Sequence, residues 1–381
     1  MRRYTLTHQL LRLPALIILP ITYGIIKLFS ANPQLVDWIY CGKIYPNLTD
    51  LVNSFTRRLP FSLAEVSLIA LVSILLLSLV IRIIKVITFR REALMRLVSL
   101  VITAAIVASY LLFAFYAMWG FNFYRTGIDK RMALPQREYG SEQLAVLCRK
   151  LTEEAAALRE KVDEDASGVF KISDPEAAFA AVEAAYTEYG EINELFAAKA
   201  PKVKSVMLSR MLSHLRILGI YSGFTAEPNI NRDQPDLYLC STAAHETAHY
   251  YGWAREDEAN FIAYLVCSRS ANVAVAYSAA MNVLTDCMSA LAYSDAKEYH
   301  EIRALYSDGM SRDLEAYSEY YKLYANDAAG ELSDHINDSY LKANGQEHGI
   351  NSYQDDVLLL LRYFDNYGLF KSAQLSPAIS W

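Results

Sequence analysis

Three long apolar stretches lie within the first 125 residues of the chain, at Leu13–Ile26, Val66–Ile81 and Leu97–Tyr124. A helix needs about 20 apolar residues to cross a bilayer, which the third stretch has and the second reaches with its flanks. The first stretch is short, but no small-x-small cleavage site follows it, which favours an uncleaved span over a signal peptide. The pattern therefore predicts membrane helices at about 11–30, 62–84 and 97–120.

The remainder of the chain has apolar positions at helical spacing. Three helices are predicted between residues 141 and 218, at Ser141–Val162, Pro175–Glu191 and Val203–Leu218. Asp174 precedes Pro175 and is expected to cap the second of them. Ile230–Leu239 reads as a loop or short strand, and after Thr242 the chain is helical nearly to Phe364. We therefore predict a mostly α fold. A three-helix membrane region at 1–124 precedes a helical domain at 125–381 with at most a small β element.

Positive charges in the loops predict how the chain crosses the membrane. Basic residues are dense at the N-terminus and in the loop between the second and third spans: Arg2, Arg3, Arg12, Arg82, Lys85, Arg90, Arg91 and Arg96. Because such loops stay in the cytoplasm, residues 125–381 are expected outside the cytoplasmic membrane.

Composition supports a membrane protein and argues against other classes. Of the 381 residues 53% are hydrophobic and 20% are charged, which is too apolar for a disordered chain. The net charge is −6 and no long basic run occurs, which argues against a nucleic-acid partner. The five cysteines form no C-x-x-C pair, so neither a zinc knuckle nor a thioredoxin-like site is indicated.

One motif indicates a metal-binding and catalytic site: His-Glu-Thr-Ala-His at 245–249. On a helix, residues four apart share a face, so His245 and His249 can present two imidazoles to one metal ion. Glu246 beside them is placed to accept a proton from water. Ser241 or Thr242 is expected to cap this helix, and Gly252 to end it.

A catalytic zinc takes three protein ligands and keeps one position open. Gly252 permits a sharp reversal of the chain, after which a second helix is predicted to start near Ala254. A carboxylate on its first turn can return to the metal, and both Glu256 and Glu258 are candidates. Asp257 is expected to point another way.

The residues after the motif resemble a known element. Glu256-x-x-Ala259-Asn260 is similar to the E-x-x-A-[DN] element of gluzincin metalloproteases. This resemblance implies Glu256 as the third zinc ligand and Asn260 as a hydrogen-bonding partner around the site. The gap of six residues between His249 and Glu256 is unusually short for that class.

The whole chain resembles the bacterial domain-of-unknown-function 3810 family. The matching features are the three N-terminal spans, the segment Phe224–Asn229 and the run His245–Phe261. The resemblance implies a zincin-like domain.

The expected function is a membrane-anchored zinc metalloprotease that acts on a peptide or protein substrate. Zn²⁺ would be held by His245, His249 and Glu256, with Glu246 as general base. Two alternatives remain. One is a non-catalytic zinc-binding scaffold or sensor. The other is a metallohydrolase acting on cell-wall amides.

Several further features have two interpretations each. Gly223–Asn231 is either an edge strand that pairs with an extended peptide or a surface loop. Cys240 and Cys267 flank the motif and either approach each other in the fold or lie apart, which the sequence does not decide. Four side chains could stabilise an oxyanion or simply pack: Tyr277, His300, His335 and His348. A group of C-terminal tyrosines at helical spacing is expected to pack: Tyr317, Tyr320, Tyr321 and Tyr324.

Overall fold

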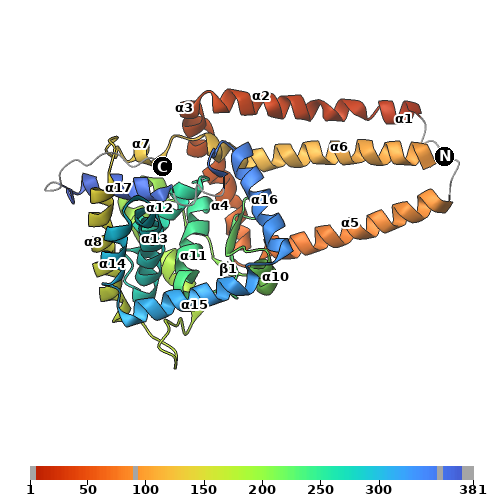
Figure 1. Ribbon diagram of the computed structural model, residues 1–381. Coiled ribbons are helices and arrows are strands. Elements are labelled where there is room, and N and C mark those ends of the chain that lie inside the picture. Colours follow the sequence, from red (N-terminus) through yellow and green to blue (C-terminus); the bar gives the residue numbers. More distant parts are fainter. Residues whose placement is uncertain (1–5, 89–92, 350–354, 371–381) are drawn as a thin grey trace.

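The computed structural model describes residues 6–88, 93–349 and 355–370, and is mostly helical (Figure 1). Helices make up 72% and strands are few, as predicted from the apolar periodicity. A helical domain forms one end of the molecule, and three long apolar helices extend away from one side of it (Figure 1).

The three predicted apolar helices are confirmed as helices long and apolar enough to cross a membrane. The first is a continuous run over Thr7–Ser30, built from α1 (Leu6–Leu10), η2 (Leu13–Ile17) and α2 (Ile18–Ser30). The others are α5 (Leu63–Thr88) and α6 (Ala93–Met118). Of the basic residues used to predict orientation, Arg2, Arg3, Arg90 and Arg91 lie outside the described residues.

The segment between the first two apolar helices packs against the helical domain. It forms α3 (Pro33–Leu35), the π-helix η3 (Val36–Ile44) and α4 (Tyr45–Thr56). Asn53 Nδ2 donates to the hydroxyl of Tyr250 at 3.1 Å, and Tyr45 Oη donates to the carbonyl of His249 at 3.3 Å. The link between two apolar helices is therefore part of the wall around the HExxH segment.

The helical domain is built from many short and medium helices. Those before the sheet are η5 (Gly120–Tyr124), α7 (Ile128–Arg131), α8 (Ser141–Arg159), α9 (Pro175–Ile192) and η6 (Glu194–Phe196), and α10 (Ser209–His214) lies between its first two strands. Those after it are α11 (Asp236–Tyr250), α12 (Glu256–Cys267), α13 (Val273–Ser294), α14 (Ala296–Arg303), α15 (Asp308–Tyr324), α16 (Ala328–Ala343) and α17 (Asp356–Asn366).

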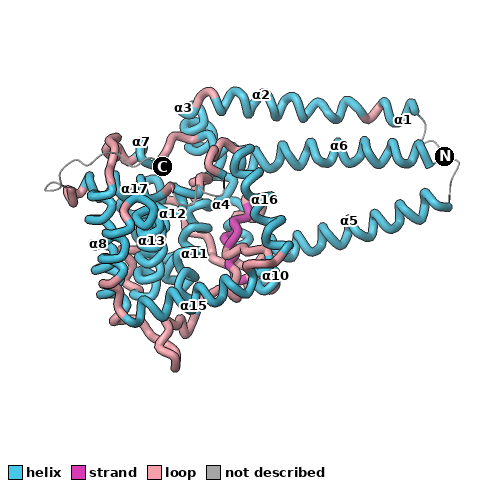
Figure 2. Tube along the Cα trace, viewed as in Figure 1, coloured by secondary structure: helices cyan, strands magenta, loops and turns pink. Residues whose placement is uncertain are grey.

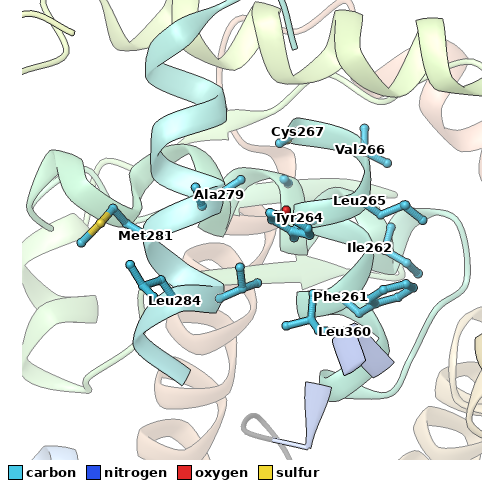
Figure 3. Packing of buried hydrophobic residues seen from close by; sticks show 14 of the residues in the cluster. Phe261, Ile262, Tyr264, Leu265, Val266, Cys267, Ala279, Met281, Leu284 and Leu360 are labelled. Atoms are coloured by element: carbon cyan, nitrogen blue, oxygen red, sulfur yellow. The ribbon is translucent and has the colours of Figure 1, made fainter. Parts of the chain in front are cut away.

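The core lies where α11, α12 and α13 pack on one another, with α8 and α17 closing its sides. Figure 3 shows Phe261 of α12 beside Leu360 of α17, and Tyr264 of α12 on the side that faces Ala279 of α13. Burying side chains such as Phe261 and Leu360 contributes about 1.5–3 kcal/mol each relative to leaving them in water. This packing fixes α11 and α12, the two helices that carry the motif residues.

A small three-stranded sheet lies between α11 and the side from which the apolar helices extend (Figure 2). Its strands are β1 (Lys204–Ser205), β2 (Gly219–Ser222) and β3 (Glu227–Ile230), in the order β1-β3-β2. β1 runs parallel to β3, and β2 runs antiparallel to it. The predicted strand within 223–231 therefore exists, but the expectation that it lies at an edge is wrong, because β3 is central and β2 is an edge.

Other helix predictions were confirmed or corrected by tertiary contacts. α8 and α9 match the predicted helices, and Asp174 caps α9 by accepting from the backbone N–H of Ala177 at 3.0 Å. The helix predicted over 203–218 is wrong in its first part, because Lys204–Ser205 pairs with β3 and only α10 is helical.

The expected start of the motif helix is also wrong. α11 begins at Asp236, directly after Pro235, so Ser241 and Thr242 lie inside the helix and cannot cap it. Proline is favoured next to a helix start, as Pro235 is here. The polar residues around Pro235 gave no helical pattern, so the first turn of α11 was not predicted.

Candidate metal centre

The motif residues lie on two helices that are joined by a tight reversal. α11 ends at Tyr250 and α12 starts at Glu256, so a short turn brings the first turn of α12 back to the last turns of α11. Gly252 adopts φ +81° in this turn, a left-handed conformation that favours glycine, and its N–H donates to the carbonyl of His249 at 2.8 Å. The predicted role of Gly252 in ending the helix is confirmed.

Each imidazole is oriented by a hydrogen bond at its outer nitrogen. His249 Nδ1 lies 2.6 Å from the carbonyl oxygen of Trp253, an acceptor, so this nitrogen carries the proton. His245 Nδ1 lies 2.7 Å from Asn260 Oδ1. Both Nε2 atoms therefore point inward, the arrangement by which outer hydrogen bonds orient metal-binding histidines.

Glu256 completes a convergent set of three side chains. Its Oε2 lies 3.0 Å from His245 Nε2 and 3.5 Å from His249 Nε2. One ligand atom from each residue lies within 4.8 Å of the others, and all three residues are buried. The backbone N–H of Glu256 donates to Gln346 Oε1 at 3.1 Å, which fixes the start of α12. Two imidazole nitrogens and one carboxylate oxygen form the donor set that zinc accepts in catalytic sites, so the residues fit this metal.

Charge coupling within the set is strong. Burial opposes the protonated imidazole, but the Glu256 carboxylate and the Trp253 carbonyl raise the pKa of His249 to about 9. Burial also raises the pKa of Glu256, yet the adjacent His249 and His245 lower it to about 2. Before a metal binds, the carboxylate is therefore ionised and His249 holds a proton at neutral pH.

Glu246 stands beside this set and against the edge strand β2. Its side chain is buried, and burial is the main cause that raises the pKa of its carboxyl group. The backbone N–H of Tyr221 hydrogen-bonds to the carboxylate and partly offsets this effect. A Cβ at Gly219 would lie 2.8 Å from Glu246 Cγ, so glycine allows the strand to approach closely. Glu246 thus faces both the convergent set and the outer edge of β2.

The other two acids of this segment face elsewhere. Glu258 Oε1 accepts from the backbone N–H of Ile128 at 2.7 Å and also from Arg255. Asp257 is outside the convergent set, and burial, followed by the charge of Glu258, raises its pKa to about 7. Of the two predicted alternatives for a third ligand, the structure brings Glu256 to the histidines and directs Glu258 away.

Aromatic side chains that sequence reasoning missed surround the site. The ring of Trp119, the residue that follows α6, packs edge-on against His249 at 5.5 Å. Tyr221 packs on Trp119 at 5.0 Å. The Tyr340 hydroxyl accepts from the Trp119 indole at 3.3 Å, and burial and the nearby Glu256 raise the pKa of Tyr340. No local pattern marks these residues, because they lie far from the motif in sequence.

The predicted oxyanion candidates form contacts away from the three convergent residues. Tyr277 donates to Asp313 at 2.6 Å within the core, and His348 lies 2.7 Å from Asp355. His300 and His335 are exposed on α14 and α16. Tyr340 is instead the phenol that the structure places near Glu256.

The remaining sequence features are structural. All five cysteines lie in the described part of the chain and are free; Cys240 and Cys267 are both buried near the motif without forming a disulfide. Of the four tyrosines of α15 that were expected to pack, Tyr317 and Tyr320 do so, whereas Tyr321 is 46% exposed. Tyr317 lies edge-on to Tyr238 at 4.6 Å, and Tyr320 donates to Ser213 at 2.9 Å.

Comparison with known proteins agrees with the sequence resemblance. Residues 40–361 match the family described as Protein of unknown function (DUF3810). Comparisons with curated proteins and with solved structures found no match. The matched range contains α5, α6, the sheet and both helices of the candidate metal centre. The chain belongs to the DUF3810 family.

Proposed function

We propose that the protein is a membrane-anchored, zinc-dependent peptidase with a zincin-like site. The observation that carries this proposal is the convergence of His245 Nε2, His249 Nε2 and Glu256 Oε2 beside the buried carboxylate of Glu246. Three ligands leave a position open for water, whereas a structural zinc site is closed by a fourth protein ligand.

The chain supplies the groups that peptide hydrolysis needs around such an ion. When bound, zinc lowers the pKa of a coordinated water and polarises the substrate carbonyl. Glu246 accepts the proton from the attacking water and delivers it to the nitrogen of the leaving amine. Its raised pKa brings the carboxyl group nearer to neutral pH, where both transfers are efficient. The Tyr340 hydroxyl accepts from Trp119, whose ring packs on His249, and would donate to the developing oxyanion.

The edge strand favours an extended peptide as substrate. The N–H of Tyr221 points from β2 toward Glu246, away from its partner strand β3. Backbone groups alternate along a strand, so those of Gly219 point the same way. A substrate can add to this edge as a further strand and lie across the site when its carbonyl oxygen replaces the Glu246 carboxylate at the Tyr221 N–H. An edge that offers regularly spaced backbone groups favours a polypeptide over a cell-wall amide.

The apolar helices supply the anchor. Their length and composition suit a bilayer, and the basic residues of the predicted cytoplasmic loops favour a domain outside the cytoplasmic membrane.

The test uses the full chain, purified in detergent and loaded with zinc. Cleavage of a mixture of unstructured peptides is followed by mass spectrometry, with cell-wall fragments assayed in parallel. Glu246→Gln is expected to lower peptide cleavage by about 10²–10⁴-fold, since a general base contributes that much, and to keep its zinc. Glu191→Gln, at an exposed position, is the matched control and is expected to keep full activity. Full activity in zinc-loaded Glu246→Gln would sink the proposal, and cleavage of wall fragments alone would replace it with an amidase.

A further inference from the structure

The hairpin that borders Glu246 is held between the ends of two apolar helices. Glu227, the first residue of β3, accepts from the backbone N–H groups of Leu63 and Ala64 at 3.2 and 2.9 Å, at the start of α5. Ser62 donates to Asn229 Oδ1 at 2.6 Å. Glu227 is buried, so these charge-assisted bonds satisfy the first turn of α5 and fix it to the sheet.

The same end of the hairpin also touches the end of α6, because Ser222 pairs with Glu227 and Gly223 follows Ser222. A Cβ at Gly223 would lie 2.7 Å from Trp119 Cβ and 3.6 Å from the carbonyl oxygen of Met118, the last residue of α6. The same Trp119 packs against His249. The edge strand β2 therefore starts beside Glu246 and ends, at Ser222, next to the place where α6 leaves the helical domain.

Apolar side chains are exposed on this side of the domain. Met207 and Leu208 lie at the start of α5, where their backbone N–H groups donate to Glu65 at 2.9 and 2.7 Å. Phe224 follows Gly223 at the end of α6. Together with residues of α10 and α16 they form what we call the juxtamembrane patch: Met207, Leu208, Met211, Phe224, Leu332 and Ile336, which are 40% to 67% exposed.

The orientation of α16 places its part of the juxtamembrane patch toward the apolar helices. Tyr340 of α16 packs edge-on against Phe115 of α6 at 6.0 Å. Leu332 and Ile336 precede it by eight and four residues, so they lie on the same side of the helix. Figure 1 shows α16 along the side of the domain from which α5 and α6 extend. An exposed row of this kind is costly in water and suits the interfacial layer of a bilayer.

We propose that the site acts on the juxtamembrane segment of another membrane-anchored polypeptide, with the juxtamembrane patch resting on the bilayer surface. This inference rests on the proposed peptidase function. A segment that adds to β2 has one end at Ser222, where α6 meets the domain, so a substrate whose chain continues into the bilayer enters the site along the strand. A soluble peptide lacks this continuation and must bind to β2 without it.

The test compares the cleavage rates of a segment held at two different distances from the bilayer. The full chain is reconstituted in phosphatidylethanolamine–phosphatidylglycerol vesicles with a randomised octapeptide library fused directly to a single transmembrane helix. A second library carries a spacer of six Glu-Ala-Ala-Ala-Lys repeats between the octapeptide and that helix. The spacer is mostly helical and holds the octapeptide about 45 Å from the bilayer. Both libraries have the same surface density, so only distance differs. The same octapeptides free in solution form a third arm.

We expect the directly fused library to be cleaved at least ten times faster than the spaced one, and the free library to be slower still. The double variant Leu332→Ser/Ile336→Ser is expected to reduce this ratio at least threefold without loss of zinc. Tyr293→Ser, at an exposed aromatic residue near the end of α13, is its matched control. Equal cleavage of the fused and spaced libraries overturns the inference and leaves the peptidase proposal standing. Cleavage of none of the three libraries by the zinc-loaded chain overturns both, and an unchanged ratio in the double variant overturns the role of the juxtamembrane patch.

Discussion

The helices α5 and α11 invert the usual relation between polarity and burial. α5 carries no charged residue between Glu65 and Arg82, and none of the residues in its most apolar window is buried. α11 carries the two histidines and Glu246, yet every residue from Leu237 to Tyr250 except Thr242 is buried. α5 is stable as drawn only in a non-aqueous solvent. α11 is stable because its polar groups pair with Glu256, Asn260 and Trp253.

The contrast also shows how each helix depends on its surroundings. α11 makes its closest contacts with α12, α13 and the sheet, so its shape is determined by packing. α5 is fixed to the domain at its first turn, through Glu65 and Glu227, and has few contacts with α6. A substitution in α11 should therefore alter the packing and stability of the whole domain. A substitution in the middle of α5 should alter only the contacts of α5 with the surrounding solvent.

The same substitution in the two helices gives the largest expected difference. Ala248 in α11 is completely buried, whereas Ala70 in α5 is exposed. Ala248→Leu should destabilise the protein by about 3 kcal/mol, because the added carbons have no space in a packed core. Ala70→Leu should leave the melting temperature of the full chain in detergent within about 1 °C, since a surface change costs little. Equal melting temperatures for the two variants would show that α11 is not packed as described.

The second prediction concerns how a polar partner supports the buried histidine. Asn260→Ala removes the acceptor at His245 Nδ1 and should weaken zinc affinity about 10–100-fold, the usual cost of losing such a partner. Asn260→Asp keeps an acceptor oxygen and should retain most of the affinity. Competition with a chelating dye measures both. An alanine variant with unchanged affinity would mean that Asn260 does not orient the ligand.

The third prediction follows from the raised pKa of His249, about 9. At pH 7 this imidazole is protonated in the metal-free chain, so zinc must displace about one proton. Affinity should then rise about tenfold per pH unit from 7 to 9 and level off above. Calorimetry in buffers with different ionisation enthalpies measures the proton, and a heat that is independent of the buffer would contradict the account.

The raised pKa also sets the stability of the metal-free chain. Because the folded-state pKa exceeds the ordinary value of 6.5, the contribution of His249 is fully present below pH 6.5 and is lost as the pH rises through 9.

Local spacing predicted the parts of the site that lie close together in sequence. His245 and His249 share a face because they are one helical turn apart, and Gly252 allows Glu256 and Asn260 to return to them. Spacing alone left Glu256 and Glu258 as alternatives, and only the resemblance to gluzincins indicated Glu256. The position of Glu258 depends on Arg255 and the backbone of Ile128, which spacing does not reveal.

The parts that sequence reasoning missed depend on contacts between distant segments. Trp119 precedes His249 by more than a hundred residues, and Tyr340 follows it by ninety-one. The helix predicted over 203–218 failed because the pairing of Lys204–Ser205 with β3 outweighed a helical pattern. The apolar helices, in contrast, could be predicted from composition and length alone. Their side chains contact few other parts of the protein, so no distant contact had to be known.

Metal content of the full chain tests the central claim most directly. The protein is purified in detergent, supplied with zinc, freed of excess metal and examined by elemental mass spectrometry. We predict about one zinc per chain in the wild type and in His300→Ala, whose imidazole is exposed on α14, and loss of that zinc in His245→Ala. A folded wild-type chain that binds no zinc would contradict the account, and His245, His249 and Glu256 would then be a buried ion-pair cluster that holds α12 against α11.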